Sequence, residues 1–156
     1  MRAEEELRFL ILGAQREGSR ALTAALAPLE LTPAQAEVVR CLADTGPISL
    51  RALGELLVCE SGSPSRLVDT LVTRDIVERR EDSADRRQVV LMLTTAGKKL
   101  DRAVRKVEDA MYAQIGTQLG SDGVGAALKL LRPMLEGSLP GTAIARRKAR
   151  LARLKA

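Results

Sequence analysis

The fold is decided by the stretch from Leu53 to Gly97, which reads LGELLVCESGSPSRLVDTLVTRDIVERREDSADRRQVVLMLTTAG. In its first part, apolar residues recur every three or four positions, as at Leu53, Leu56 and Leu57. This spacing predicts two helices that each bury one side. After Arg74 the apolar period changes to two, which predicts two strands joined by the charged segment EDSADRRQ. Two packed helices followed by a charged hairpin indicate a winged helix-turn-helix, a module that reads DNA.

The second of these helices is the expected recognition helix. It should start near Ser61, which can cap it, with Pro64 in the first turn. With Val68, Leu71 and Val72 turned inward, the outward face presents short polar side chains and one arginine: Ser63, Ser65, Arg66, Asp69, Thr70 and Thr73. Such side chains at a helix N-terminus can reach base edges and phosphates. The alternative is a surface helix whose polar side only faces water.

The hairpin mixes arginines with acids: Arg79, Arg80, Arg86 and Arg87 with Glu78, Glu81, Asp82 and Asp85. A carboxylate two residues before Arg87 can hold the guanidinium in one pose for a narrow groove. We therefore predict DNA contacts for Asp85, Arg86 and Arg87. Arg51 and Arg74 are further candidates, for phosphate contacts. The alternative is a solvated hairpin tip whose ion pairs contribute little.

The sequence resembles the MarR family of bacterial transcription regulators. The resemblance depends on the paired-helix pattern LGELL…SRLVDTLVTRDIVERR, the Asp85-Arg86-Arg87 tip, and LMLTTAG before a long helix. It extends from Leu31 to about Leu135. It implies that Arg87 enters the minor groove with Asp85 as its partner. It also implies a repressor whose dimer reads a pseudo-palindrome.

Composition agrees with a mainly α fold that has a small β-hairpin wing. The chain has 156 residues, and Phe9 and Tyr112 are its only aromatic residues. A core of Leu, Val, Ile and Ala suits helices, and the length suits one domain with helical extensions. The longest apolar run, FLIL at 9–12, is too short to span a bilayer. Without a signal-peptide pattern at the start, we expect a cytoplasmic protein with no membrane contact.

Caps and turns predict the elements before the recognition helix. Thr32 and Pro33 start a helix that runs to about Ala43, and a turn over 44–47 follows. Residues 48–50 should form a short strand that leads into a helix over 51–58. Thr94 or Thr95 should cap the long helix after the hairpin.

Three further helices predict a dimerisation region. One covers residues 3–27 and ends at Pro28, and two cover 96–118 and 123–136, with Gly120 between them. The helix over 96–118 has an apolar stripe typical of a helix–helix seam, formed by Leu100, Val104, Val107, Met111 and Ile115. We therefore predict dimerisation through 1–30 and 96–137 around a winged helix-turn-helix domain at 31–95. Packing within one chain is the alternative.

The C-terminal tail supplies the excess of positive charge. The chain has 25 Lys and Arg against 20 Asp and Glu. The segment 142–156 contains no acid and six of the basic residues: Arg146, Arg147, Lys148, Arg150, Arg153 and Lys155. After a break over 137–141, this tail should be helical when it has a partner. It contacts DNA phosphates, lies on an acidic surface of the partner subunit, or is a frayed, solvated tail.

Two routes to regulation follow from the sequence and the resemblance. Oxidation of Cys59, just ahead of the recognition helix, would disturb the docking of that helix. The alternative is that Cys41 and Cys59 are small hydrophobes, reduced in the cytoplasm. The family's peroxide-sensing cysteine lies in the first long helix, which has none here. A small effector would lie between the winged domain and the dimer helices. With two aromatic residues and no histidine, the composition disfavours a stacking pocket for a phenolic ring, and an aliphatic or salicylate-like ligand held by an arginine is the alternative.

Other functional classes are disfavoured. The chain has no histidine, which argues against an enzyme with a His-based acid or base and against a His-containing zinc site. The glycines near position 120 follow no strand, so they do not predict a phosphate loop. We expect no cofactor and no metal. The rival interpretation is a winged-helix module or anti-repressor that binds a protein instead of double-stranded DNA.

Overall fold

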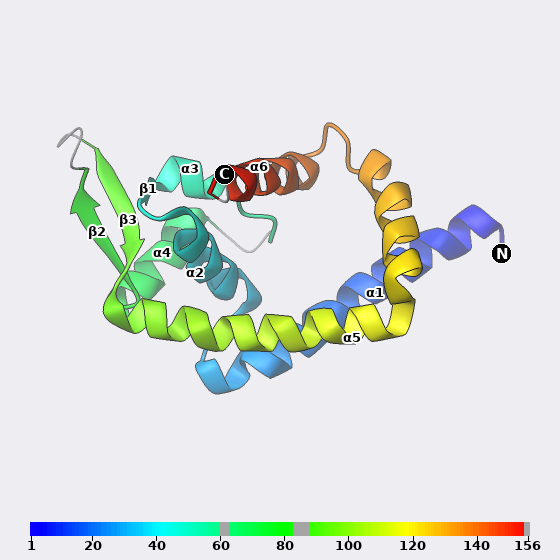
Figure 1. Ribbon diagram of the computed structural model, residues 1–156, viewed down its shortest axis with the longest axis horizontal. Helices are drawn as coiled ribbons and strands as arrows, with labels where there is room; N and C mark the ends of the chain where they lie inside the picture. The colour runs from blue at the N-terminus through cyan, green and yellow to red at the C-terminus, as the bar shows by residue number, and fades with distance from the viewer. Residues whose placement is uncertain (60–62, 83–87, 155–156) are drawn as a thin grey trace.

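The computed structural model describes residues 1–59, 63–82 and 88–154. It confirms a mainly helical fold with a small antiparallel sheet (Figure 1). The elements, in chain order, are α1 (Ala3–Leu26), η1 (Ala27–Leu29), α2 (Pro33–Thr45), β1 (Ile48–Ser49), α3 (Leu50–Gly54), α4 (Pro64–Thr73), β2 (Val77–Glu81), β3 (Val89–Leu93), α5 (Thr95–Met134) and α6 (Leu139–Leu154). The sheet has the order β1-β3-β2, with Ile48 opposite Leu91 and Val77 opposite Leu93.

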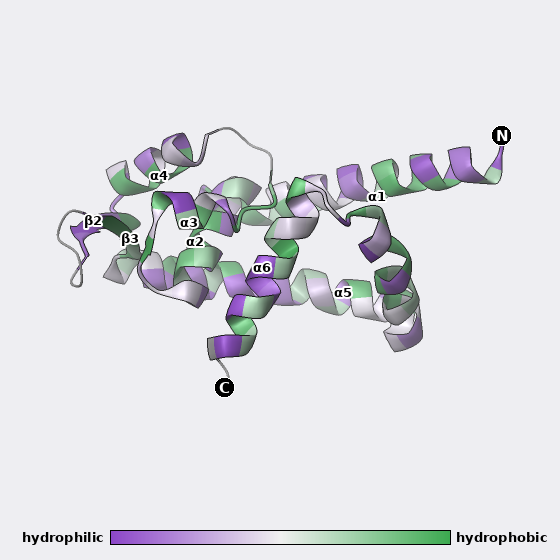
Figure 2. Ribbon diagram, turned by 90° about the horizontal axis from the view of Figure 1, so that it is seen from above, coloured by the Kyte–Doolittle hydropathy of each residue, from purple (hydrophilic) through white to green (hydrophobic). Residues whose placement is uncertain are grey.

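The winged unit, residues 31–95, is built around α2. This helix packs against α4, α5 and β3, and its Val38 and Val39 are fully buried. In Figure 2, α4 and α5 lie on opposite sides of the unit, with α2 and α3 between them. The other core side chains are also aliphatic, as the composition predicted, and include Leu53, Val68, Leu71, Leu91 and Val104.

Two threonine caps lie at the predicted positions. Thr32 forms a capping box with Gln35, and its hydroxyl accepts from the Gln35 N–H at 3.2 Å. Thr94 Oγ1 accepts from the Gly97 N–H at 3.0 Å and donates to the Asp75 carbonyl at 2.6 Å. A Cβ at Gly97 would collide with the Ile76 carbonyl oxygen. The glycine of LTTAG therefore lets α5 start directly against the turn that ends α4.

The expected helix over 51–58 is wrong in its second half, because α3 ends at Gly54. The backbone N–H groups of Val58 and Cys59 donate to the Glu37 carboxylate instead of to helix carbonyls. The recognition helix α4 starts at Pro64, with Ser63 as its N-cap, later than the start predicted near residue 61. Ser61 itself lies outside the described residues.

Boundaries differ at two other places. Helix α2 runs on to Thr45, two residues past its predicted end, and Gly46 with φ 69° ends it. The break predicted near Gly120 is present, because a φ of 65° at this glycine turns the chain within α5. The break predicted over 137–141 is shorter, since α6 begins at Leu139. The Ser138 hydroxyl accepts from the Gly141 N–H at 3.2 Å and caps this start.

The predicted apolar stripe on α5 divides into two parts. Leu100, Val104 and Val107 pack on the core of their own chain. Ile115, farther along, is exposed, as are Leu119 and Leu128. The first half of the stripe is therefore an intrachain contact, and only the second half is free for another surface. Within the described residues, no helix is both long and apolar enough to cross a membrane.

A charge network joins α2 to α5. The Arg40 guanidinium, with a side chain 12% exposed, donates to Glu108 at 2.8 Å, to Asp101 at 2.9 Å and to Asp44 at 3.3 Å. Arg105 closes the network by donating to Asp101 and Asp44, both at 2.9 Å. Burial acts to lower the pKa of Arg40, but the surrounding carboxylates outweigh it and raise that pKa. Arg40 therefore stays charged at the junction.

We predict that Arg40→Ala lowers the free energy of unfolding by about 3 kcal/mol, because it leaves partly buried carboxylates without their cation. Urea denaturation, monitored by circular dichroism, measures the free energy of unfolding. The control is Lys106→Ala, an exposed α5 residue without an ion pair among the described residues, and it should change stability by less than about 0.5 kcal/mol. Equal effects of the two substitutions would show that the network does not stabilise the junction.

Candidate nucleic-acid interface

The outward face of α4 is polar and its inward face is fixed on the core. Val68 and Leu71 are fully buried, whereas Asp69, Thr70 and Thr73 are exposed. Ser63 and Ser65 lie at the N-terminus, with their hydroxyl oxygens 2.6 Å apart. This arrangement presents hydrogen-bonding groups on a helix that cannot rotate without exposing its apolar side.

Arg66 is exposed in the first turn of this face, and its side chain has no ion pair among the described residues. The Thr70 hydroxyl donates to the Arg66 carbonyl at 3.0 Å, a contact of the backbone that does not involve the guanidinium. A guanidinium without an ion pair among the described residues is available for base edges or phosphates. The structure therefore brings Ser63, Ser65, Arg66 and Thr70 together, as the sequence analysis expected.

The wing, formed by β2, β3 and their connection, is tied to this helix. Arg79 of β2 pairs with Asp69 of α4 at 2.5 Å. The pair neutralises an acid that would otherwise repel phosphates beside Arg66. Neighbouring Arg80 pairs with Glu78 at 2.8 Å along the same strand. The predicted contacts of Asp85, Arg86 and Arg87 lie outside the described residues.

The two arginines predicted to contact phosphates differ in their surroundings. Arg51, on α3, has a side chain 92% exposed and lies 3.6 Å from the Glu55 carboxylate. Arg74 follows α4 and donates to the Glu30 carbonyl at 2.6 Å. This bond anchors the C-terminal end of α4 to the segment after η1. Both contacts with DNA stay predictions.

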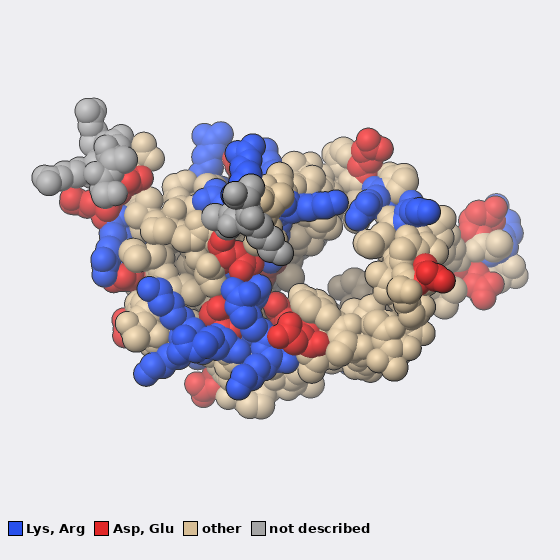
Figure 3. Space-filling view, viewed as in Figure 1, with Lys and Arg blue, Asp and Glu red and all other residues tan. Residues whose placement is uncertain are grey.

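The basic C-terminal helix docks on its own winged unit, an arrangement that none of the alternatives drawn from the sequence described. Arg146 pairs with Glu55 at 2.6 Å, Arg147 pairs with Glu37 at 2.8 Å, and Arg150 donates to the Thr45 carbonyl at 3.4 Å. Figure 3 shows basic side chains gathered over α6. The acidic surface belongs to the same chain. The one hint in the sequence was Glu37, an acid between the apolar residues Ala36 and Val38 of α2.

Comparison with known proteins identifies the group to which this architecture belongs. The model of the MarR family matches residues 31–89, which span α2 to the start of β3. The multiple antibiotic resistance protein MarR of Escherichia coli is 30% identical over 130 residues, covering 81% of this chain and 88% of that protein. The chain belongs to the MarR family.

Two solved protein–DNA complexes contain a protein with the same fold. A mutant MarR from E. coli complexed with operator DNA has a TM-score of 0.73 at 28% identity, covering 83% of this chain and 94% of that one. The transcriptional repressor CouR bound to a 23-mer DNA duplex has a TM-score of 0.74 at 25% identity, covering 85% and 94%. MarR-family proteins are DNA-binding transcriptional regulators and not enzymes, so the predicted class is confirmed.

The two cysteines of this MarR-family chain differ in exposure but not in acidity. Cys41 is buried on α2, and Cys59 is exposed ahead of α4. Burial raises the pKa of Cys41 to about 11. Burial, followed by the charge of Glu37 and a hydrogen bond to it, raises the pKa of Cys59 to about 11 as well. Both thiols are protonated at neutral pH, and thiols in that state are poor nucleophiles.

One cavity lies where the sequence analysis placed a small effector in this MarR-family chain, between the winged unit and α5. It has a volume of about 380 Å³ and is lined by Leu42, Ala43, Gly46, Pro47, Met92, Leu93, Lys98, Asp101, Arg102 and Arg105. Arg105 is occupied by Asp101 and Asp44. Lys98 and Arg102 have no ion pair among the described residues and give the cavity a cationic rim.

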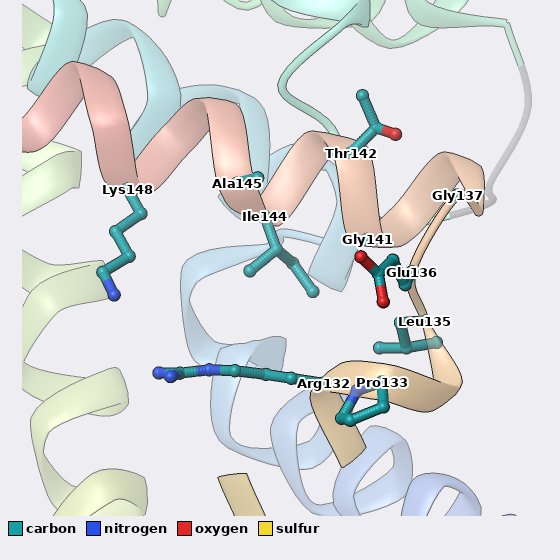
Figure 4. Close-up of a pocket in the computed structure, with 10 residues that line it drawn as sticks. All are labelled: Arg132, Pro133, Leu135, Glu136, Gly137, Gly141, Thr142, Ile144, Ala145 and Lys148. Atoms are coloured by element: carbon teal, nitrogen blue, oxygen red, sulfur yellow. The ribbon is translucent and has the colours of Figure 1, made fainter. Parts of the chain in front are cut away.

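A second cavity, of about 530 Å³, lies at the elbow between α5 and α6 (Figure 4). Pro133, Leu135 and Ile144 form apolar walls, while Arg132 and Lys148 extend toward one another from the two helices. Neither cation has a carboxylate partner within the part of the chain that the structure describes. The elbow is thus an apolar hollow lined by two cations, Arg132 and Lys148, and by one acid, Glu136.

We predict that alkylation of Cys59 by iodoacetamide accelerates about tenfold per pH unit from about pH 7 to 10, without a plateau, because the thiolate fraction rises steadily below a pKa near 11. Mass spectrometry of the Cys41→Ala protein isolates the signal of Cys59. A plateau below about pH 9 would instead reveal a thiol of ordinary or enhanced acidity.

Proposed function

We propose that this chain is a repressor that binds a pseudo-palindromic operator as a homodimer. The main observation is the polar outer face of α4, where Arg66, which has no ion pair among the described residues, lies beside Ser63 and Ser65. In this proposal these three residues enter the major groove, together with Ser61 and Thr70. Arg87, held by Asp85, enters the minor groove, with Arg86 beside it. Arg51 and Arg74 contact phosphates.

The homodimer is supported by apolar surface that the chain itself does not cover. Leu7, Phe9 and Leu10 are exposed on the N-terminal half of α1, which extends away from the body in Figures 1 and 2. Exposed apolar residues also follow the distal part of α5: Ile115, Leu119, Leu128, Leu130, Leu131 and Met134. Apolar surface of this extent is typical of an interface.

Charge complementarity suggests how two copies meet. Glu4, Glu5 and Glu6 lie in the first turn of α1 and have no ion pair among the described residues. The elbow cavity offers Arg132 and Lys148 beside apolar walls. We infer that the acidic, apolar start of α1 from one copy docks at the elbow of the other.

We predict that Arg132→Glu combined with Lys148→Glu weakens the dimer at least about tenfold, because like charges then face each other across the interface. Sedimentation velocity over a dilution series measures this. Adding Glu4→Lys, Glu5→Lys and Glu6→Lys to the same chain should restore association. Lys129→Glu, an exposed change on α5 outside the cavity, is the control. Dimers of unchanged strength in the reversed protein would exclude this docking.

We propose that the protein is released from DNA either by binding of a small organic anion or by oxidation of Cys59. The cavity rimmed by Lys98 and Arg102 supports the first route, because it touches both β3 and α5. The raised pKa of Cys59 makes the second route slow. Binding measured with and without salicylate, and with and without peroxide, separates the two.

The test is fluorescence anisotropy with the DNA upstream of the protein's own coding region, at two salt concentrations. We predict steep loss of affinity as salt rises, because phosphate contacts release counterions. Arg66→Ala and Arg87→Ala should each weaken specific binding about tenfold or more. Dimer strength and melting temperature should not change.

The control for these variants is Lys106→Ala, which removes a positive charge from the exposed side of α5. If it weakened binding as much as Arg66→Ala, the loss would reflect net charge and not recognition. Absence of binding at either salt concentration would contradict the proposal and favour the protein-binding module.

A further inference from the structure

Glu37 is a buried carboxylate on α2 that lies outside the surface proposed to face DNA. Its residue is 9% exposed. Oε1 accepts from the Val58 N–H at 2.9 Å, and Oε2 accepts from the Cys59 N–H at 2.8 Å. Val58 and Cys59 end the described segment before α4, whose N-cap, Ser63, follows four residues later. The carboxylate therefore holds the backbone of Val58 and Cys59, the last described residues before the recognition helix.

The same carboxylate is held from the other side by the C-terminal helix. Arg147 Nη1 donates to Glu37 Oε1 at 2.8 Å, across 110 positions of sequence. Ala143, one turn earlier on α6, is buried at this contact side of the helix. In Figure 1, α6 runs back from the elbow toward α3, so it bridges the distal end of α5 and the winged unit.

Charge explains why the two contacts depend on each other. A buried carboxylate is costly unless it is hydrogen-bonded and paired with a cation. Two backbone N–H groups satisfy part of its capacity, and Arg147 supplies the only guanidinium that pairs with it among the described residues. Loss of Arg147 would leave this carboxylate without its cation and weaken the contact that it makes with the segment at 57–59.

We propose that Glu37 and Arg147 are positioning residues for DNA recognition. Docked α6 keeps Glu37 charged and oriented, Glu37 holds the segment at 57–59, and that segment sets the N-terminal end of α4. Neither residue touches DNA. The proposal rests on the proposed function, and it makes α6 the route by which a movement at the elbow or dimer helices reaches the recognition helix.

The experiment compares Arg147→Ala with Arg153→Ala, which removes an equal charge from an exposed position of α6 that has no ion pair among the described residues. The first readout is affinity for operator DNA. The second is hydrogen exchange of the Val58 and Cys59 amides, followed by NMR, which needs no DNA. We expect Arg147→Ala to weaken specific binding about tenfold and to accelerate exchange at both amides by a similar factor. Arg153→Ala should change neither.

Two further variants separate positioning from general stability. Arg147→Lys should recover part of both effects, because an ammonium can still pair with the carboxylate. Glu37→Gln should act in the same direction as Arg147→Ala. The double variant should be no worse than the more severe single variant, since both substitutions break one chain of contacts.

Three outcomes would overturn the proposal. Equal weakening by Arg147→Ala and Arg153→Ala, with unchanged amide exchange, would mean that α6 contacts phosphates directly. Unchanged affinity and exchange in Arg147→Ala would mean that the pair has no positioning role, and fully additive losses in the double variant would mean that the residues act separately. If the parent protein failed to bind DNA, the proposed function would fail, while the exchange measurement would still test the link between Arg147 and the segment at 57–59.

Discussion

The ion-pair network around Arg40 is the constraint on which the rest of the structure depends. It joins α2, the centre of the winged unit, to the first half of α5 through Asp44, Asp101 and Glu108. Apolar packing by Leu100, Val104 and Val107 lies beside it, but such contacts alone permit sliding. Directional bonds from Arg40 to Asp101 and Glu108, and from Arg105 to Asp44, fix the register of the two helices. The orientation of the winged unit relative to the distal half of α5 follows from this register.

The starts of helices and the strands of the wing could be predicted from the sequence wherever a short motif determines backbone geometry. Thr32 before Pro33 and Thr94 before Gly97 gave the starts of α2 and α5, because capping acts over three residues. The alternation after Arg74 gave the wing. The end of α3 at Gly54 was not predictable in this way. Its cause is Glu37, whose carboxylate competes for the N–H groups of residues 58 and 59 from another helix.

In the candidate site, too, the local features could be predicted from the sequence and the long-range contacts could not. The polar face of α4 follows from helical period, so Ser63, Ser65, Arg66 and Thr70 were found together. The pairing of Asp69 with Arg79 and the docking of α6 depend on which acid a given arginine reaches in space, and helical and strand periods contain no such information. The sequence alone therefore gave no partner for the basic tail, whereas in the structure its arginines pair with Glu37 and Glu55 of the same chain.

The left-handed conformation of Gly120 has a consequence for how such a protein diverges. At 1.5 Å per residue, the straight part of α5 from Thr95 to the residue before Gly120 is a rod about 37 Å long, comparable with one turn of DNA. The glycine ends this rod and redirects the chain without a loop. In the proposed homodimer, adding or removing residues on the near side of the glycine would alter the distance between the two recognition helices and leave their side chains unchanged. The length of α5 before Gly120 and the DNA bases that each recognition helix contacts could then change independently in evolution.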